Sequence, residues 1–401
     1  EDYEPVFVPN GTTLGYKVVD GVKVFHLTAE PVIQEVAPGL TVNCWGYNGG
    51  VPGPLIEVVE GDRVRIYVTN HLPARTSVHW HGILLPCGMD GVSGVTQPAI
   101  PPGKTFLYEF IFPDVGTFMY HPHFDSMTQE GLGLAGMIVV HPREPDREPP
   151  ERDFSLMLHE WAIEAGTSRP NTLENSDFNI LTINGKAFPG THPLAAELGD
   201  RVRIRIGNLS AMDHHPIHLH GYAFDVVGTD GGLIEEEHQT PETTVLVHVG
   251  STRTIELEAD NPGDWIMHCH MTHHTMNQMG HGFPNMVGVD TAGIDRKIRN
   301  VLPGYMTMGT KGMTPLQEMN APIPGNSIPM LGYSAQFGET VLGSMVTMLK
   351  VRRHAPGYAD PGPYDFPEGT VSQEATEAEL ERDGIELPGA TPEQGRAMQS
   401  P

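Results

Sequence analysis

The sequence has few cysteines, few basic residues and no long apolar run, and each shortage excludes a class of protein. Three cysteines in 401 residues are too few for the disulfide frameworks that hold small secreted domains together. The 24 basic residues are outnumbered by 50 acidic ones, for a net charge of −26. This argues against nucleic acid as a partner, because binding it depends on neutralising phosphates. No apolar run reaches the length that crosses a bilayer, so we expect no membrane span.

Glycine and proline are plentiful instead, with 46 and 36 residues, which favours turn-rich β structure over helical bundles. Cys44 and Cys87 could pair in an oxidising compartment, and two free thiols are the equal alternative. The chain begins at Glu1 without a start methionine. We expect a removed export signal and a periplasmic or extracellular location.

The sequence contains one pattern twice. The hexamer GDRVRI occurs at 61–66 and again at 199–204, and apolar residues alternate with polar ones there as in a half-buried strand. In both copies a loop and a His-x-His-Gly follow, and then an alternating strand, a glycine turn and a second His-x-His. The chain therefore holds two copies of one β unit, each a candidate β-sandwich.

These repeats predict an all-β protein with two tandem β-sandwich domains and a long, mostly irregular C-terminal extension. We assign residues 1–145 to the first domain, 146–290 to the second and 291–401 to the extension. The charged, proline-rich stretch 141–153 is the expected linker.

The extension differs in composition from the repeats. Twelve of the 19 methionines lie between 267 and 348, which we call the Met-rich segment. We expect the extension, residues 291–401, to pack on a neighbouring subunit. Residues 342–353 predict one more strand, because they echo 132–142 at the end of the first unit. A short helix is expected around 374–383.

Four His-x-His pairs are the strongest functional signal. Residues i and i+2 of a strand point to the same face, so each pair presents two imidazoles, which suit copper, zinc, iron or nickel. One pair alone is more often structural, but four pairs at matched places in two repeats indicate a metal site. The pairs are His79 and His81, His121 and His123, His218 and His220, and His268 and His270.

The stretch DWIMHCHMTHHTMNQM, residues 264–279, places a cysteine between two of these histidines. In a strand, Cys269 points away from the face of its histidine neighbours, so it serves a second site. Its candidate partners are His215, His274 and Met279. Two histidines, a cysteine and a weak axial methionine are the ligands of an electron-transfer blue copper. Zinc fits less well, because it usually prefers a closed tetrahedral site without a thioether.

Together the motifs HxHG, HxH, HPxHLHG and HCHxxxHxxxxM resemble the copper signatures of the multicopper oxidases, the laccase-like family, in the family's order. The resemblance implies cupredoxin-like Greek-key sandwiches. It also implies four coppers per chain, with electrons relayed one at a time to dioxygen, which is reduced to water. It assigns His79 and His218 to type 2 copper; His81, His121 and His270 with His123, His220 and His268 to the type 3 pair; and His215, Cys269, His274 and Met279 to type 1 copper.

The sequence departs from the three-domain laccases, because no middle domain fits between its repeats. Pro122 and Met127 stand where the second repeat has its type 1 cysteine and histidine, so only the second repeat would carry type 1 copper. In this the chain looks like the two-domain laccases, whose relatives are homotrimers with each trinuclear cluster shared between adjacent subunits. We expect that a monomer cannot complete its own cluster.

Three acidic features need separate interpretation. Asp90 matches the family's Asp-Gly acid beside the type 2 copper, and we expect it to help deliver protons, although an Asp-Gly is ordinarily just a turn. Asp125 is a weaker candidate that suits a loop residue better. The run EEEH at 235–238 could attract a cation, but a solvated loop is the simpler interpretation.

We therefore predict a laccase-like copper oxidase that takes electrons from phenols or small aromatic donors at His274. A metallo-oxidase for Cu(I) or another metal in copper tolerance is the main alternative, because thioethers are soft ligands for Cu(I); methionines that fill packing gaps explain the Met-rich segment more simply. Copper nitrite reductase is a third reading, but it carries its type 1 cysteine in the first domain and lacks the eight-histidine set. A non-catalytic copper-binding protein would not need a complete set of cluster and electron-transfer ligands.

Overall fold

The computed structural model describes residues 3–145, 148–164, 166–277, 325–329 and 333–387, with isolated positions between 293 and 301. Met279 and most of the Met-rich segment lie outside the described residues. The chain forms two compact units, of which the first combines residues 1–282 with 324–362 and the second combines 283–323 with 363–401. Within the described residues we find no helix with the length and apolar character needed to cross a membrane.

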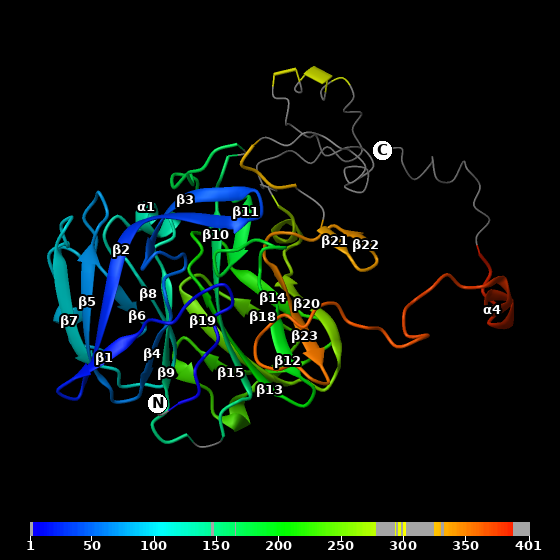
Figure 1. The fold of residues 1–401 in the computed structure, drawn as a ribbon, viewed down its shortest axis with the longest axis horizontal. Coiled ribbons are helices and arrows are strands. Elements are labelled where there is room, and N and C mark those ends of the chain that lie inside the picture. Colours follow the sequence, from blue (N-terminus) through cyan, green and yellow to red (C-terminus); the bar gives the residue numbers. More distant parts are fainter. Residues whose placement is uncertain are drawn as a thin grey trace. The chain divides into compact units, whose positions relative to one another are not determined.

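The first unit begins with a sandwich of two β-sheets (Figure 1). One sheet has the strand order β1-β2-β5-β7 with β3 paired to β2, and the other has the order β4-β9-β8-β6. The alternation of the first GDRVRI copy is realised in β5, where Val64, Ile66 and Val68 are fully buried. The strands are β1 (Tyr16–Val19), β2 (Val22–Ala37), β3 (Leu40–Tyr47), β4 (Ile56–Val59), β5 (Arg63–Asn70), β6 (His79–His81), β7 (Thr105–Ile111), β8 (Gly116–His121) and β9 (Gly136–His141).

The second sandwich again pairs two β-sheets, with more strands in each sheet. One sheet has the order β11-β10-β13-β19-β15-β16 with β17 paired to β15, and the other has the order β12-β23-β20-β14-β18. Its strands are β10 (Arg152–Trp161), β11 (Ile180–Ile183), β12 (Leu194–Glu197), β13 (Arg201–Asn208), β14 (His215–Leu219), β15 (Phe224–Thr229), β16 (Gly232–Leu233), β17 (Thr240–Glu242), β18 (Thr244–Val247), β19 (Ser251–Glu258), β20 (Gly263–Cys269) and β23 (Val346–Arg352).

The last of these strands comes from the stretch that we assigned to the extension. β23 runs parallel to β12 and antiparallel to β20, as β9 runs parallel to β4 and antiparallel to β8 in the first sandwich. The strand predicted at 342–353, and its likeness to the end of the first unit, are thereby confirmed. In Figure 1 this orange strand lies among the green strands of the second sandwich. The second sandwich therefore closes only after the chain returns from the Met-rich segment.

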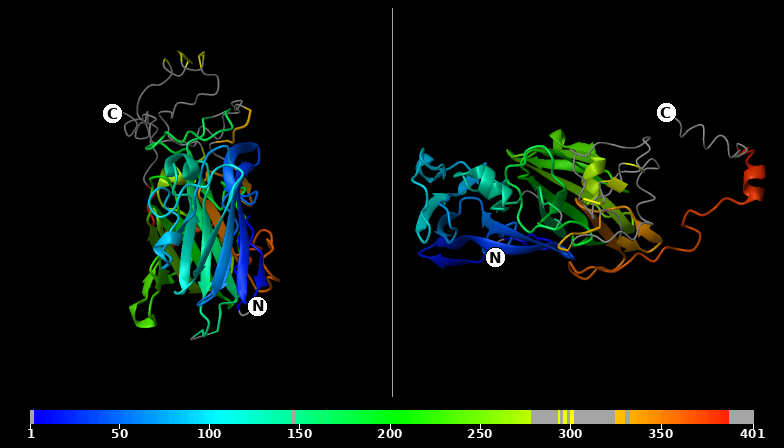
Figure 2. Two further views of the ribbon diagram at one scale, coloured as in Figure 1. Left: turned by 90° about the vertical axis from the view of Figure 1, so that its left-hand side faces the viewer. Right: turned by 90° about the horizontal axis from the view of Figure 1, so that it is seen from above.

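Polar side chains join the two sandwiches where their sheets meet. Arg205 is buried and donates to both carboxylate oxygens of Asp153 at 2.8 Å, and it also donates to the hydroxyl of Thr117 in β8 at 2.9 Å. The end of the long strand β2 contacts the second sandwich as well, since the backbone N–H of Ala187 donates to the carbonyl of Val36. Figure 2 shows this blue strand reaching the green strands. These hydrogen bonds join the two sandwiches within the first unit.

Helical segments are few and short among the described residues. Those in the first unit are η1 (Cys87–Met89), α1 (Ser126–Gly131), η2 (Glu236–His238) and η3 (Thr272–Thr275), and a small hairpin pairs β21 (Tyr333–Ala335) with β22 (Gly338–Thr340).

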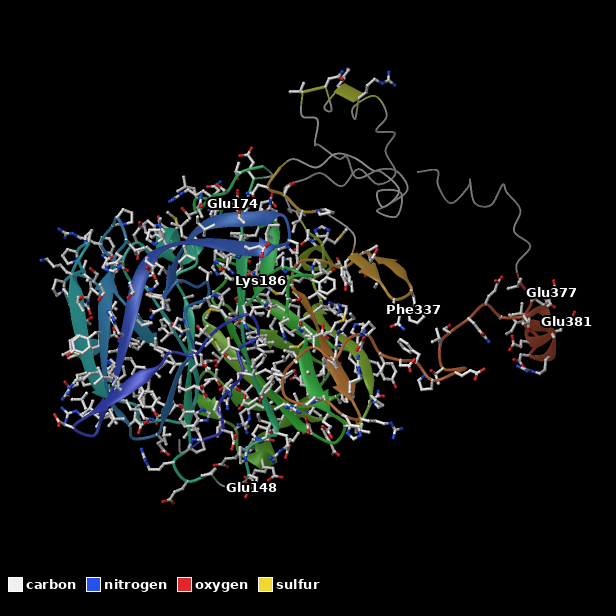
Figure 3. All side chains as sticks on the ribbon, viewed as in Figure 1. Glu148, Glu174, Lys186, Phe337, Glu377 and Glu381 are labelled. Carbon is white, nitrogen blue, oxygen red and sulfur yellow. The ribbon has the colours of Figure 1, made fainter. Side chains whose placement is uncertain are left out.

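In the second unit, α4 (Glu377–Arg382) begins with a capping box between Thr376 and Glu379, and its Glu377 and Glu381 project outward (Figure 3). This confirms the short helix expected around 374–383. The all-β, two-sandwich prediction is also confirmed.

Candidate metal centre

The first-sandwich histidines gather around two neighbouring strands. β6 and β8 are antiparallel, with His79 opposite His121, so the histidines of β6 and the end of β8 share one face. The ring of His79 lies 5.7 Å from that of His81, 5.3 Å from that of His121 and 5.7 Å from that of His123. Trp80, between the two β6 histidines, is buried on the opposite face. One sheet edge thus presents four imidazoles.

The second sandwich presents an equivalent set on β14 and β20. These strands are antiparallel, with His218 opposite His268. The ring of His218 lies 4.9 Å from that of His220, 5.7 Å from that of His268 and 5.5 Å from that of His270. The predicted His-x-His pairs therefore assemble into two sets of four, which we call the first and second histidine sets.

Backbone carbonyls hold several of these rings from behind. The Nδ1–H of His79 donates to the carbonyl of Asp90 (2.8 Å), and that of His121 donates to the carbonyl of Pro122 (2.9 Å). In the second set, the Nδ1–H of His218 donates to the carbonyl of Thr243 (2.6 Å), and that of His268 donates to the carbonyl of Cys269 (2.8 Å). A hydrogen bond at one ring nitrogen fixes the tautomer, so the lone pair is at Nε2. Each of these rings is therefore oriented as a metal-bound histidine is.

The spacing between ring nitrogens also fits a metal ion. Nδ1 of His81 lies 3.2 Å from Nε2 of His121, and Nε2 of His220 lies 3.2 Å from Nε2 of His268. Two nitrogens bound to one ion at about 2.0–2.1 Å and near a tetrahedral angle would be ~3.3 Å apart. The family resemblance would give His81 and His121 to one type 3 copper and His220 and His268 to the other, and this assignment stays a prediction.

Burial favours the neutral form of four of these imidazoles. It lowers the pKa of His79, His81, His220 and His268, and neutral imidazole is the form that binds metal. His121 differs. Burial lowers its pKa too, but the hydrogen bond and charge of Glu130 outweigh this, and the pKa is raised.

A separate buried trio lies on the reverse side of β20. Sγ of Cys269 lies 3.4 Å from Nδ1 of His274 and 3.7 Å from Nδ1 of His215. All three side chains are almost completely buried, and burial lowers the pKa of His215 to about 3 and raises that of Cys269 to about 12. Without a cation the sulfur is therefore a thiol, and a coordinating metal would deprotonate it. This arrangement fits a His₂Cys copper site.

The outer nitrogens of the trio have partners that sequence reasoning did not identify. Ser210 Oγ lies 2.8 Å from Nε2 of His215, and a carboxylate oxygen of Asp213 lies 3.5 Å from Nε2 of His274. Glu160 holds the loop that carries Asp213 by accepting from the backbone N–H groups of residues 212 and 213. Asp213 stands two residues before a predicted ligand, a signal that was available. Glu160 is 53 residues away from it, and nothing local marks it.

The remaining candidates have the following positions. Asp90 lies directly after η1, and its carboxylate is 3.4 Å from Nδ1 of His79, which already bonds the Asp90 carbonyl. Asp125 begins α1, where its carbonyl accepts from the N–H groups of Thr128 and Gln129, so its observed contacts are structural. Glu235, Glu237 and His238 form an exposed group within metal-binding distance of one another. Met279 is outside the described residues.

Cys44 and Cys87 do not form a disulfide. Cys44 is a buried free thiol, and Cys87 is an exposed one. The alternative of two free thiols is therefore the correct one. Neither cysteine lies in the groups of metal-binding side chains found among the described residues.

The two histidine sets remain apart within one chain. Over the described residues, the ring contacts and hydrogen bonds between these histidines join members of the same set and never a member of one to a member of the other. The family resemblance implies a trinuclear cluster with eight histidine ligands, and each sandwich offers four of them.

Comparison with known proteins settles the family. A family profile described as Multicopper oxidase matches residues 31–145, and a second profile with the same description matches residues 163–288. The chain belongs to the multicopper oxidase family. The two matches fall one in each sandwich of this multicopper oxidase, and the expected cupredoxin-like fold is confirmed by the structural likeness described next.

The solved blue copper oxidase from Nitrosomonas europaea resembles the chain with a TM-score of 0.60 and 26% identity, over 85% of this chain and 91% of that one. Copper resistance protein A of Pseudomonas syringae pv. tomato is 42% identical over 47% of this chain and 38% of its own length. The "Probable nitrite reductase-hydroxylamine oxidoreductase fusion protein" of Kuenenia stuttgartiensis is 30% identical over 65% of this chain and 31% of its own length. The multicopper oxidase thus spans well under half of either curated relative.

Proposed function

We propose that this multicopper oxidase takes electrons one at a time from a small reductant at His274 and uses them to reduce dioxygen to water at a three-copper cluster. The main support is the position of Cys269, whose sulfur faces His215 and His274 while its two chain neighbours belong to the second histidine set. A covalent path of one residue therefore joins the two sites.

In this proposal the copper ligands follow the family pattern. His215, Cys269, His274 and Met279 would hold type 1 copper, and His79 and His218 would hold type 2 copper. His81, His121 and His270, and His123, His220 and His268, would hold the type 3 pair, for four coppers per chain. The metal would supply one-electron redox chemistry. The chain would orient the ligands, exclude water and deliver protons.

A cluster built from both histidine sets requires a second copy of the chain. Because the sets of one chain stay apart, the first set of one protomer would meet the second set of the next. Such a head-to-tail interface closes into a ring when its rotation permits, and we propose a homotrimer with a cluster at each subunit interface.

Protons for water formation would come through Asp90. Its carboxylate lies beside His79, a proposed type 2 ligand, and it is only half-buried, so it contacts both the first histidine set and solvent. A carboxylate in this position can take protons from water and pass them inward.

Two classes of electron donor fit the proposed function, small aromatic compounds and Cu(I). A laccase-like enzyme would oxidise phenols or other small aromatic donors. A metallo-oxidase that oxidises Cu(I) is the second candidate, favoured by the likeness to copper resistance protein A. The exposed thioethers of Met212 and Met271, each three residues from a type 1 ligand, also favour it, since thioethers are soft ligands for Cu(I).

Metal counting with oxygen-uptake measurements tests the whole proposal. The expected result is four coppers per chain, an intense blue absorption, a separate type 2 paramagnetic signal and oxygen uptake that depends on a reductant. Competition between Cu(I) and a phenol identifies the preferred donor. Copper without oxygen uptake would indicate a binding protein, and nitrite consumption in place of oxygen would indicate a nitrite reductase.

An exported location, periplasmic or extracellular, is part of the same proposal. The reducing cytosol is rich in thiols, which are soft ligands that compete for copper. Cell fractionation with an antibody against the chain would test the location.

A further inference from the structure

One carboxylate contacts the first histidine set from an unexpected direction. Glu130 lies at the end of α1, and its Oε1 is 3.2 Å from Nδ1 of His121. That nitrogen also bonds the carbonyl of Pro122 at 2.9 Å, so one N–H is shared between a neutral acceptor and a charged one. Nε2 of His121 is left for the metal, facing Nδ1 of His81.

The neighbours of Glu130 keep this contact in place. Gln129 is fully buried; it accepts from the hydroxyl of Thr76 and donates to the carbonyl of Arg75, both at 2.7 Å. These bonds fix the last turn of α1 against the loop before β6. The Glu130 side chain is 24% exposed. Burial and two neighbouring tyrosines are the larger causes that raise the pKa of the buried Tyr47, and the charge of Glu130 raises this pKa further. The carboxylate therefore faces the interior.

The second repeat provides an internal comparison. His268 corresponds to His121, and nine residues further on the second repeat has Asn277 in place of Glu130. Asn277 accepts from the backbone N–H of Ser344 at 2.9 Å, so it braces the start of β23. Nδ1 of His268 donates to the backbone carbonyl of Cys269, and among the described residues no carboxylate contacts this nitrogen as Glu130 contacts that of His121.

A carboxylate behind a ligating imidazole changes the ligand in two ways. It fixes the tautomer and ring orientation, and its negative charge makes the metal-bound nitrogen more basic. Loss of such an outer partner typically lowers metal affinity about 10- to 100-fold. A neutral carbonyl supplies the orientation with less of the charge effect, so the two histidine pairs should not be equivalent.

We propose that Glu130 is a positioning residue that strengthens His121 as a ligand, so that the copper position at His81 and His121 binds more tightly than the one at His220 and His268. The idea rests on the proposed function, because it concerns two members of the proposed cluster. It adds an inequivalence within the type 3 pair, produced by a residue outside the ligand motifs.

Copper binding by the full-length Glu130→Gln variant tests this. Glutamine keeps the length and an accepting oxygen but removes the charge. After dialysis against a graded series of chelator concentrations, we expect the variant to lose about one copper per chain at a chelator level about 10- to 100-fold lower than the wild type. The two coppers of a type 3 pair are magnetically coupled, so the loss of one would leave the other paramagnetic. A new signal should therefore appear in the paramagnetic-resonance spectrum.

Two further variants keep the test decisive. Asp114→Asn removes an exposed carboxylate of the same sandwich and should bind copper as the wild type does. Glu130→Asp keeps the charge on a side chain one methylene shorter and should fall between the wild type and Glu130→Gln. Circular dichroism and thermal unfolding of the whole chain report whether each variant is folded.

Wild-type copper retention and an unchanged resonance spectrum in a folded Glu130→Gln variant would overturn the proposal. If Glu130→Gln lost type 2 copper and kept the coupled pair, the assignment of Glu130 to His121 would be wrong. A wild-type protein that holds no coupled pair at all would contradict the proposed function instead, so the two failures are distinguishable.

Discussion

Cys269 and His268 are consecutive residues of β20 whose side chains belong to different sites. The sulfur of Cys269 lies 3.4 Å from Nδ1 of His274, in the buried trio. Nε2 of His268 lies 3.2 Å from Nε2 of His220, in the second histidine set. The alternation of a β-strand is sufficient to produce this. One strand thereby contributes a ligand to a candidate type 1 site on one face and a ligand to a candidate cluster on the other, with a single peptide bond between the two residues.

Replacement of Cys269 by serine should separate the two sites. We expect Cys269→Ser to lose the blue absorption and about one copper per chain, because a hydroxyl is a poor substitute for a thiolate at a soft site. The cluster coppers should remain, because their ligands are on the other face. Oxygen uptake with any donor should fall to background. Metal counting and the resonance spectrum check this, and loss of all coppers in a folded variant would show that the sites are not independent.

Mixing two defective chains tests the shared cluster. His81→Ala damages the first histidine set, and His220→Ala damages the second. If each cluster takes one set from each of two chains, random co-assembly of equal amounts should restore about one quarter of the clusters. Each variant alone should be inactive.

Oxygen uptake after joint refolding or co-expression is the measurement. A cluster made within one chain would give no recovery, because every chain carries one damaged set. Activity in either variant alone would show that the substituted histidine is not needed.

The sequence was sufficient to predict what depends on strand periodicity. Alternation in β5 and β13, and the His-x-His pairs of β6 and β20, follow from a period of two residues, and the structure confirms the β-sandwich repeat. The closing strand β23 was recognisable because it echoes β9. Its partners were not predictable, because 76 residues separate the end of β20 from the start of β23, and nothing local indicates where such a long connection returns.

The partners behind the ligands were the least predictable part of the site. Glu130 and Glu160 lie on α1 and β10, and only the packing of these elements brings them to His121 and to the loop of Asp213. A carboxylate at these places is indistinguishable in sequence from a solvated one. The separation of the two histidine sets within one chain likewise depends on how the sandwiches pack, and the sequence motifs alone do not encode it.

Replacement of Asp90 by asparagine should slow turnover without removing copper. Asparagine keeps the shape and cannot carry a proton, so the rate of oxygen reduction should fall by about 100-fold. Wild-type turnover should decline as the pH rises and protons become scarce, and the variant should be slow throughout. Steady-state oxygen uptake over a pH series, with copper content measured alongside, checks this. Turnover equal to the wild type at every pH would exclude a proton-transfer role for Asp90.

Glu160 predicts how the stability of the metal-free protein depends on pH. Burial and the charge of Asp213 raise the pKa of Glu160 from 4.5 to about 8, while a hydrogen bond from His274 lowers the pKa of Asp213. Between pH 4.5 and 8 the folded state therefore holds a proton on Glu160 that the unfolded chain has released. The folded state binds more protons there, so this group makes the free energy of unfolding fall as the pH rises through that range.

Glu160→Gln should remove this dependence. Glutamine is neutral at every pH and can still accept from the N–H groups of residues 212 and 213, so the variant should match the wild type near pH 4. Near pH 9 it should be more stable by at least about 1 kcal/mol, the free energy of one pKa unit being ~1.4 kcal/mol. Chemical unfolding of the metal-free proteins at both pH values measures the difference. A variant less stable than the wild type at pH 9 would mean that Glu160 is ionised and favourably paired in the folded protein.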